Sequence, residues 1–299
     1  MNRKAKQLIW ICLGATLGAI ASWWVLFQPA RQSLRFESAR AVAPGHAFSY
    51  EPFAGALRAY VDDRGLVNYR ELKANRQDID FFAASIASLE PSVYAQWSGN
   101  EKIAFLINGY NALTLEAIIS NYPIKASLTR SVLYPRNSIR QIPGVWDKLD
   151  FLVMGQRTTL DHIEHEILRK DFNEPRIHVA LVCAAMGCPP LRNEPYSGEN
   201  LDCQLDDQSR KFLASPRRFR IDREKGVVYL SPIFKWYGTD FERRFATNDG
   251  VGAHSRAERA VLSYVSDFLS VEDRNYLATR TYSIQYLDYD WSLNEQRYE

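Results

Sequence analysis

The sequence predicts an α+β fold: a single domain of helices and small sheets behind one N-terminal transmembrane or signal-anchor helix. Three observations predict it. The chain begins with a basic flank and a long uncharged stretch, several later segments have helical spacing, and two segments alternate around glycine turns. Because these segments do not repeat as β-α-β units, an α+β class is favoured over a parallel α/β class.

Composition fits a globular domain with no electrostatic preference for nucleic acid. The chain has 299 residues, of which 46% are hydrophobic and 24% charged, and its formal net charge is only +2. A chain of this size can bury an ordinary core, and so small a net charge creates no global field that attracts nucleic acid. We therefore expect no nucleic-acid partner. The predicted organisation is a signal anchor or transmembrane segment at 1–28, a linker at 29–50, one domain at 51–291 and a tail at 292–299.

The N-terminus predicts a membrane segment. The run from Leu8 to Phe27 has no charged residue, and at about 1.5 Å per residue it can cross a hydrocarbon core of about 30 Å. The basic stretch MNRKAK comes first, so the positive-inside rule keeps residues 1–7 in the cytoplasm and exports the rest. We expect residues 8–27 to hold the protein in the membrane. The alternative is a signal peptide cleaved after the small residues Ala19 and Ala21.

Hydrophobic periodicity predicts the elements of the domain. The segment 100–123 is the strongest helix, with Asn100 as its N-cap and Pro123 beyond its end. The apolar run from Val179 to Cys183 has the length of a strand and predicts a central one. The other predicted helices are 53–63, 71–89, 158–170 and 255–270; the predicted hairpins are 150–160 and 218–232; and 282–294 predicts a last strand.

Two pairs of polar residues share helix faces. Asn108 and Asn111 lie three residues apart in an apolar helix, where a buried amide needs hydrogen-bond partners. They either brace a loop or serve a reaction, by orienting an imidazole or as an oxyanion donor. His162 and His165 have no HExxH pattern and no third ligand at a defined spacing, so we expect no metal. His165 is either a structural histidine or a general base.

The stretch RIHVALVCAAMGCPPLR combines a histidine with two cysteines. On a strand, His178 and Cys183 would point to opposite faces because their separation is odd, which makes His165 the leading candidate for a base. In an oxidising compartment, one disulfide and one free thiol are the simplest outcome, and either Cys183 or Cys203 can pair with Cys188. The prolines after Cys188 remove the usual helix-start activation of a thiol, although a neighbouring imidazole can also activate it.

Several motifs in order resemble the bacterial, exported or membrane-anchored branch of the domain of unknown function 547 family. They are FLINGYNALTL, LDHIEHEILR, DFNEPRIHVALVCAAMGCPPLR, LDDQSRKFL and YLSPIFKWYGTDF. The resemblance covers most of residues 51–291, with Leu106 where the family pattern usually has Trp. It implies a mostly exported bacterial domain of unassigned activity. Together with the predicted membrane segment at 8–27, it leads us to expect a single-pass protein of the bacterial inner membrane with its main domain in the periplasm. The family's polar positions correspond to Asn108, Asn111, Glu164, His165, His178, Cys183 and Cys188.

These residues support two main hypotheses of function. The first is a thiol-dependent hydrolase or acyltransferase that acts on amide substrates such as peptides in the cell envelope, without a cofactor. A cysteine would be its nucleophile, a histidine its base, and an asparagine would orient that base. The second is a non-catalytic envelope module that binds a protein or peptide partner, and a metal or thiol-redox role is a third. The candidate catalytic residues are Cys188, Cys183, His165, His178, Asn108, Asn111 and Glu164.

Overall fold

The computed structural model describes residues 32–33, 48–245 and 254–297. The chain divides into two units, residues 1–33 and 34–299. In the first unit the described residues form β1 (Gln32–Ser33). The predicted membrane segment at 8–27 and most of the predicted linker lie outside the described residues. The helices and small sheets of the second unit confirm the α+β class.

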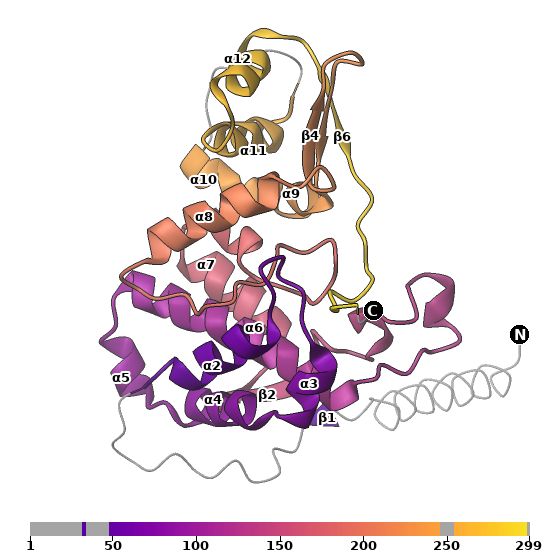
Figure 1. The fold of residues 1–299 in the computed structure, drawn as a ribbon. Helices are drawn as coiled ribbons and strands as arrows, with labels where there is room; N and C mark the ends of the chain where they lie inside the picture. The colour runs from indigo at the N-terminus through magenta and orange to yellow at the C-terminus, as the bar shows by residue number, and fades with distance from the viewer. Residues whose placement is uncertain (1–31, 34–47, 246–253, 298–299) are drawn as a thin grey trace, which may run out of the picture. The chain divides into compact units, whose positions relative to one another are not determined.

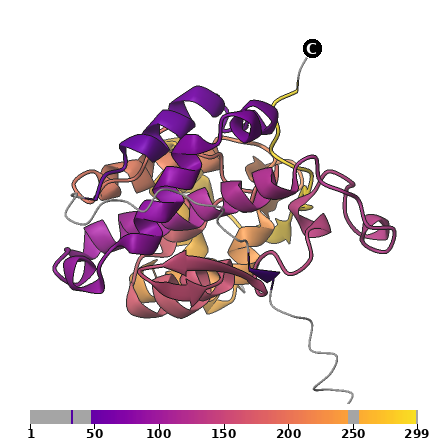
Figure 2. The same ribbon diagram turned by 90° about the horizontal axis from the view of Figure 1, so that it is seen from below.

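The first half of the domain is a group of helices around a large apolar core (Figure 1). Its members are α2 (Glu51–Tyr60), α3 (Tyr69–Ala74), α4 (Gln77–Ser88), α5 (Pro91–Ala95) and α6 (Gly99–Asn121). The contacts of α4 with α2 and α6, and of α3 with α6, hold the group together (Figure 2). The single helix predicted over 71–89 is wrong, because Asn75 leaves the helical conformation and its side-chain amide donates to the Glu71 carbonyl.

Helix α6 is the centre of this group. It is long and apolar enough to cross a membrane by composition, but 94% of its most apolar window is buried inside the domain. A helix that is apolar on all sides is expected to form a core of this kind. Its N-cap is Ser98, which forms a capping box with Glu101, and the predicted cap at Asn100 is therefore wrong by two residues.

The middle of the chain contains a hairpin and a series of short helices. Strands β2 (Leu149–Val153) and β3 (Gln156–Thr158) pair antiparallel, as predicted. Met154 and Gly155 form their turn, and both have positive φ, as a two-residue hairpin turn with the twist of the strands requires. The short helices are η1 (Arg130–Val132), η2 (Ile139–Gln141), η3 (His162–Leu168), α7 (Arg169–Asp171) and η4 (Pro175–Val179).

The second half of the domain has its own apolar core. Strands β4 (Phe219–Asp222) and β5 (Val227–Leu230) form the predicted hairpin, and β6 (Ser283–Tyr286) pairs parallel with β5. The late strand is thus confirmed over four residues. The helices of this half, orange to yellow in Figure 1, are α8 (Leu201–Leu213), α9 (Pro232–Tyr237), η5 (Gly238–Phe241), α10 (Glu242–Phe245), α11 (Arg256–Ser266) and α12 (Val271–Thr279).

The chain after β6 returns to the first half of the domain (Figure 1). The amide of Leu293 donates to the carbonyl of Asn137 (2.8 Å), and the amide of Asn294 donates to the carbonyl of Ala184 (3.2 Å). The Asn294 carbonyl accepts from the amide of Val67 (2.9 Å). Residues that the sequence assigns to the start of a tail are therefore joined to the cysteine-containing segment.

A buried carboxyl on α6 makes stability depend on pH. Glu116 is 2% exposed, its nearest cation is Arg76 at 3.9 Å, and its Oε2 has no hydrogen-bond partner. Burial, opposed by Arg76, raises the pKa of Glu116 from 4.5 to about 8. In the unfolded chain this carboxyl ionises near its ordinary pKa, whereas the folded protein keeps it protonated. The free energy of unfolding that Glu116 contributes is therefore fully present below about pH 4.5 and falls as the pH rises towards 8.

We expect Glu116→Gln to remove this part of the pH dependence. Between pH 5 and 8 the free energy of unfolding of the wild type should fall relative to the variant by roughly 2–4 kcal/mol. Urea unfolding of both proteins at several pH values measures the difference. A difference that does not change with pH would show that Glu116 ionises normally in the folded protein.

Candidate functional site

A pocket of about 460 Å³ brings together five of the seven candidate residues. They come from two segments: Glu164 and His165 from η3, and His178, Cys183 and Cys188 from η4 and the chain after it. Aromatic side chains form much of the remaining wall, among them Tyr110, Trp146, Trp236, Tyr237, Tyr289 and Trp291. Polar groups that converge in a concave aromatic pocket are the usual mark of a binding or active site.

His178 is the buried histidine of the pocket. Its side chain is 1% exposed, and its Nε2 lies 2.8 Å from the Asp240 carboxylate. The ring stacks on Tyr237, with centroids 4.0 Å apart and an angle of 15° between the planes. Because the carboxylate can only accept, Nε2 carries the proton and Nδ1 of the neutral ring holds a lone pair. Asp240 and Tyr237 therefore fix the orientation of His178 and leave Nδ1 as its basic atom.

Asp240 is held in its ionised form by two hydrogen-bond donors, His178 and Arg169. Arg169 donates to both of its carboxylate oxygens, at 2.6 and 2.9 Å. Burial on its own would raise the pKa of Asp240, but the hydrogen bonds from His178 and Arg169 outweigh burial and hold this pKa well below its usual range. The carboxylate is therefore ionised throughout the neutral pH range and can stabilise a charged His178.

His165 occupies a more constrained position than His178. Arg169 donates to its Nδ1 at 3.0 Å, and its Nε2 lies 3.8 Å from the Asp161 carboxylate. Both ring nitrogens thus face charged groups, and the side chain is 35% exposed. The sequence makes His165 the leading base, whereas the geometry of the pocket favours His178, because only His178 keeps a lone pair that no arginine occupies.

Glu164 is buried beside two tyrosines. Burial and then the neighbouring Glu164 carboxylate raise the pKa of both Tyr110 and Tyr237. The turn that carries Glu164 is π-helical, which changes the directions of consecutive side chains relative to an α-helix. Glu164 therefore points into the protein next to His165, and its contacts suit a role in holding the tyrosines of the wall.

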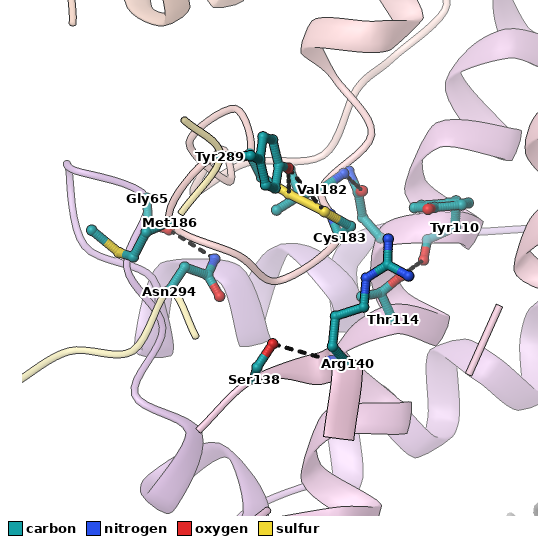
Figure 3. The surroundings of a disulfide bond; sticks show 12 residues. Gly65, Tyr110, Thr114, Ser138, Arg140, Val182, Cys183, Met186, Tyr289 and Asn294 are labelled. Atoms are coloured by element: carbon teal, nitrogen blue, oxygen red, sulfur yellow. Dashed lines mark hydrogen bonds between the residues drawn. A yellow bond between two sulfur atoms is a disulfide. The ribbon is translucent and has the colours of Figure 1, made fainter. Parts of the chain in front are cut away.

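The two cysteines of the pocket are joined. Cys183 and Cys188 form a disulfide with a Cα–Cα distance of 6.2 Å, and Cys203 on α8 is free and exposed. The Tyr289 hydroxyl lies 3.2 Å from the Cys183 sulfur and 3.0 Å from the Cys188 sulfur (Figure 3). Disulfide sulfurs carry no proton, so the hydroxyl is the donor. The Cys183 backbone amide also donates to the Cys188 sulfur, at 3.1 Å.

The loop between the cysteines is held in an uncommon conformation by the C-terminal segment. Ala184 has a φ of +57°, a region that costs a residue with a side chain about 1 kcal/mol. A Cβ at Gly187 would lie only 2.9 Å from the ring of Tyr289, so glycine is required for this ring to approach. The Gly187 amide also donates to the carbonyl of Asp290 (2.8 Å). These contacts bring the Tyr289 hydroxyl to the sulfurs.

The predicted strand from Val179 to Cys183 is wrong. In its place, η4 ends at Val179 and an irregular segment follows. The amides of Ala180 and Leu181 donate to the Ile177 carbonyl at 2.9 Å, so no partner strand is needed there. The alternation argument that separated His178 from Cys183 does not apply, and both side chains line the same pocket.

Asn108 and Asn111 do not line the pocket but brace the backbone beside it. The amide of Asn108 donates to the Tyr196 carbonyl (2.8 Å) and accepts from the Tyr196 amide (2.9 Å). Asn111 in the same way donates to the Ala180 carbonyl (3.0 Å) and accepts from the Val182 amide (2.9 Å). These contacts support the interpretation that the two asparagines brace a loop over the one in which they serve a reaction.

Several residues of the site were not singled out from the sequence. Asp240, Tyr237 and Tyr289 come from the second half of the chain, and no spacing relates them to the cysteines. The signal that could have found them is their place in the motif YLSPIFKWYGTDF and in the predicted last strand at 282–294, where polar and aromatic residues are concentrated. Among the described residues, no group of three or more His, Cys, Asp or Glu side chains is arranged to hold a metal ion.

Comparison with known families identifies the segment that forms most of this site. Residues 94–213 match the model of the family described as protein of unknown function, DUF547. This match supports the DUF547 family. The DUF547 segment contains all seven candidate residues, whereas Asp240 and Tyr289 lie beyond its end. No curated protein and no solved structure matches the chain.

Removal of the Asn111 side-chain amide tests whether it braces the backbone. We expect Asn111→Ala to lower the free energy of unfolding by about 2–4 kcal/mol, because it leaves the Ala180 carbonyl and the Val182 amide buried without partners. Urea unfolding measures this loss, with Asn275→Ala on the exposed surface of α12 as the control. A loss no larger than that of the control would contradict the brace.

Proposed function

We propose that this domain is a thiol-dependent hydrolase or acyltransferase that acts on amide substrates, with reduced Cys188 as the nucleophile and His178 as the base. One observation carries the proposal: His178, oriented by Asp240, lines the same pocket as both sulfurs. Nucleophile, base and orienting carboxylate are the three roles that this chemistry needs. The order of these residues along the chain has no importance, because such sites are defined by geometry.

The surroundings of Cys188 favour it over Cys183. Its sulfur is approached by two donors, the Cys183 backbone amide at 3.1 Å and the Tyr289 hydroxyl at 3.0 Å. Hydrogen bonds to the charged form of a group stabilise that form, so both donors would stabilise a Cys188 thiolate once the pair is reduced. Cys183 has the Tyr289 hydroxyl as a donor but no comparable backbone amide among the contacts of the described residues.

The reaction that follows is a double displacement. His178 takes the thiol proton, and the Cys188 thiolate attacks the amide carbon. The C–N bond breaks, the departing amine takes the proton from His178, and a thioester remains. Water, or an acceptor amine or hydroxyl, then attacks the thioester, gives its proton to His178 and releases the Cys188 thiolate.

The disulfide is the resting form in this proposal and must first be reduced. A dithiol reductant supplies two electrons and two protons. Its thiolate attacks Cys183, which is partly exposed while Cys188 is 1% exposed, and Cys188 leaves as a thiolate. The second thiol of the reductant then displaces Cys183, and the reductant becomes a disulfide.

The alternative is a non-catalytic envelope module, and the disulfide itself favours it. As long as Cys183 and Cys188 are joined, neither sulfur can act as a nucleophile. The pocket, with its aromatic wall, would then serve to bind a peptide or a small molecule. Both proposals include the location expected from the sequence, which is an exported domain in the bacterial periplasm anchored by residues 8–27. The basic flank and the uncharged run support it.

The nucleophile can be tested by labelling. In a Cys203→Ser background, reduced protein is treated with iodoacetamide over a range of pH, and mass spectrometry locates and quantifies the label. We expect Cys188 to react with a midpoint well below the ordinary thiol pKa of roughly 8.5, because the thiolate is the reactive form. His178→Ala should move this midpoint up, whereas His162→Ala, which removes an exposed histidine of η3, should not.

Two results would contradict the nucleophile. One is a Cys188 midpoint at or above roughly 8.5. The other is a pair that stays oxidised when the protein is treated with excess dithiothreitol under native conditions. Either result would leave the binding module as the better account of the pocket.

A further inference from the structure

One wall of the pocket contains an arginine that is held by aromatic rings. Arg140 belongs to η2, and Figure 3 shows its side chain extending towards the cysteines. Its guanidinium carbon lies 4.1 Å from the ring centroid of Trp291, 4.8 Å from that of Trp146 and 5.1 Å from that of Tyr134. Stacking of this kind fixes the plane of a guanidinium while leaving its N–H groups free to donate.

Arg140 differs from the other arginines around the site in its partners. Arg169 donates to both oxygens of Asp240, and Arg176 forms ion pairs with three carboxylates. Within the described part of the chain, no carboxylate lies within 4 Å of the Arg140 guanidinium, and its buried Nε has no hydrogen-bond partner. That Nε is closed to the pocket, so the donors that a ligand with acceptor oxygens can reach are the terminal N–H groups of the guanidinium.

The carboxylates of the same pocket do not fill this position. Asp161 lies beside His165, at 3.8 Å. Asp147 is exposed at the rim. Burial raises the pKa of Asp161, and Arg140 acts on it only as one of the weaker opposing charges. The donors of Arg140 therefore face a pocket of about 460 Å³ with room for an acceptor supplied from outside.

We infer that Arg140 binds a carboxylate of the ligand, so the substrates of this site are amides that also carry a free carboxylate, such as the C-terminal end of a peptide. A guanidinium offers paired N–H groups that match the two oxygens of a carboxylate. The part of this inference that concerns a reaction rests on the proposed function. The binding of the carboxylate does not, because it requires no reduced thiol.

Tryptophan fluorescence gives a direct test, because Trp146 and Trp291 contact both Arg140 and the pocket. The full-length protein, with its disulfide intact, is titrated with an N-acetylated dipeptide that ends in a carboxylate and with the same dipeptide ending in a carboxamide. We expect saturable binding of the carboxylate and at least about tenfold weaker binding of the carboxamide. Arg140→Gln should weaken binding of the carboxylate by about tenfold or more, and Arg140→Lys should restore only part of it.

Arg136→Gln is the matched control, since Arg136 is an exposed arginine four residues earlier and does not line the pocket. Circular dichroism confirms that each variant is folded. Equal binding of the two dipeptides, binding of neither, or an Arg140→Gln variant that binds like the wild type would overturn the inference.

The outcome separates this inference from the proposed function. If Cys188 is labelled with a midpoint well below roughly 8.5 and the dipeptides bind equally, the carboxylate site is wrong and the nucleophile stands. If the carboxylate binds through Arg140 and Cys188 titrates like an ordinary thiol, the ligand class stands and the pocket belongs to a binding module.

Discussion

The hydrogen bonds between Asn111 and the chain at Ala180 and Val182 are the interaction on which the rest of the site depends. This segment forms neither helix nor strand, and its buried backbone groups need partners that regular structure does not supply. The central helix α6 supplies them from within the core through the side chain of Asn111. The side chain of Asn108 does the same for the backbone of Tyr196, later in the chain. A rigid helix thereby determines where an irregular, cysteine-containing loop lies. The positions of the site residues on that loop are therefore fixed by the core.

The second constraint is the return of the C-terminal segment to the first half of the domain. It places the Tyr289 hydroxyl at both sulfurs and Trp291 under the Arg140 guanidinium. The same segment pairs with Ala184 and Val67, so its position is set by backbone contacts on both sides. The cysteine loop, the arginine and the aromatic wall are therefore one structural unit, although they come from distant parts of the chain.

Local patterns predicted the elements well and the site only in part. The apolar run of α6 and the glycine turns of the two hairpins are local signals, and the structure confirms them. The apolar residues 179–183 have the composition of a strand, but their backbone partner is a side chain about 70 residues away. Asp240 lies 62 residues from His178, and Tyr289 lies 101 residues from Cys188. No periodicity within the chain reports contacts of this range. The sequence favoured His165 over His178 because a strand would have put His178 and Cys183 on opposite faces, and that strand does not form.

The most direct test of a thiol active site is capture of the acyl-enzyme. Reduced full-length protein in a Cys203→Ser background is mixed with an activated ester of an N-acetylated amino acid, and the intact mass and the modified peptide are determined. This account predicts one acyl group, attached to Cys188, which forms in the reduced protein, is absent from the oxidised protein and is lost in His178→Ala. Acylation that is equal in Cys188→Ser, or that does not depend on reduction, would contradict it.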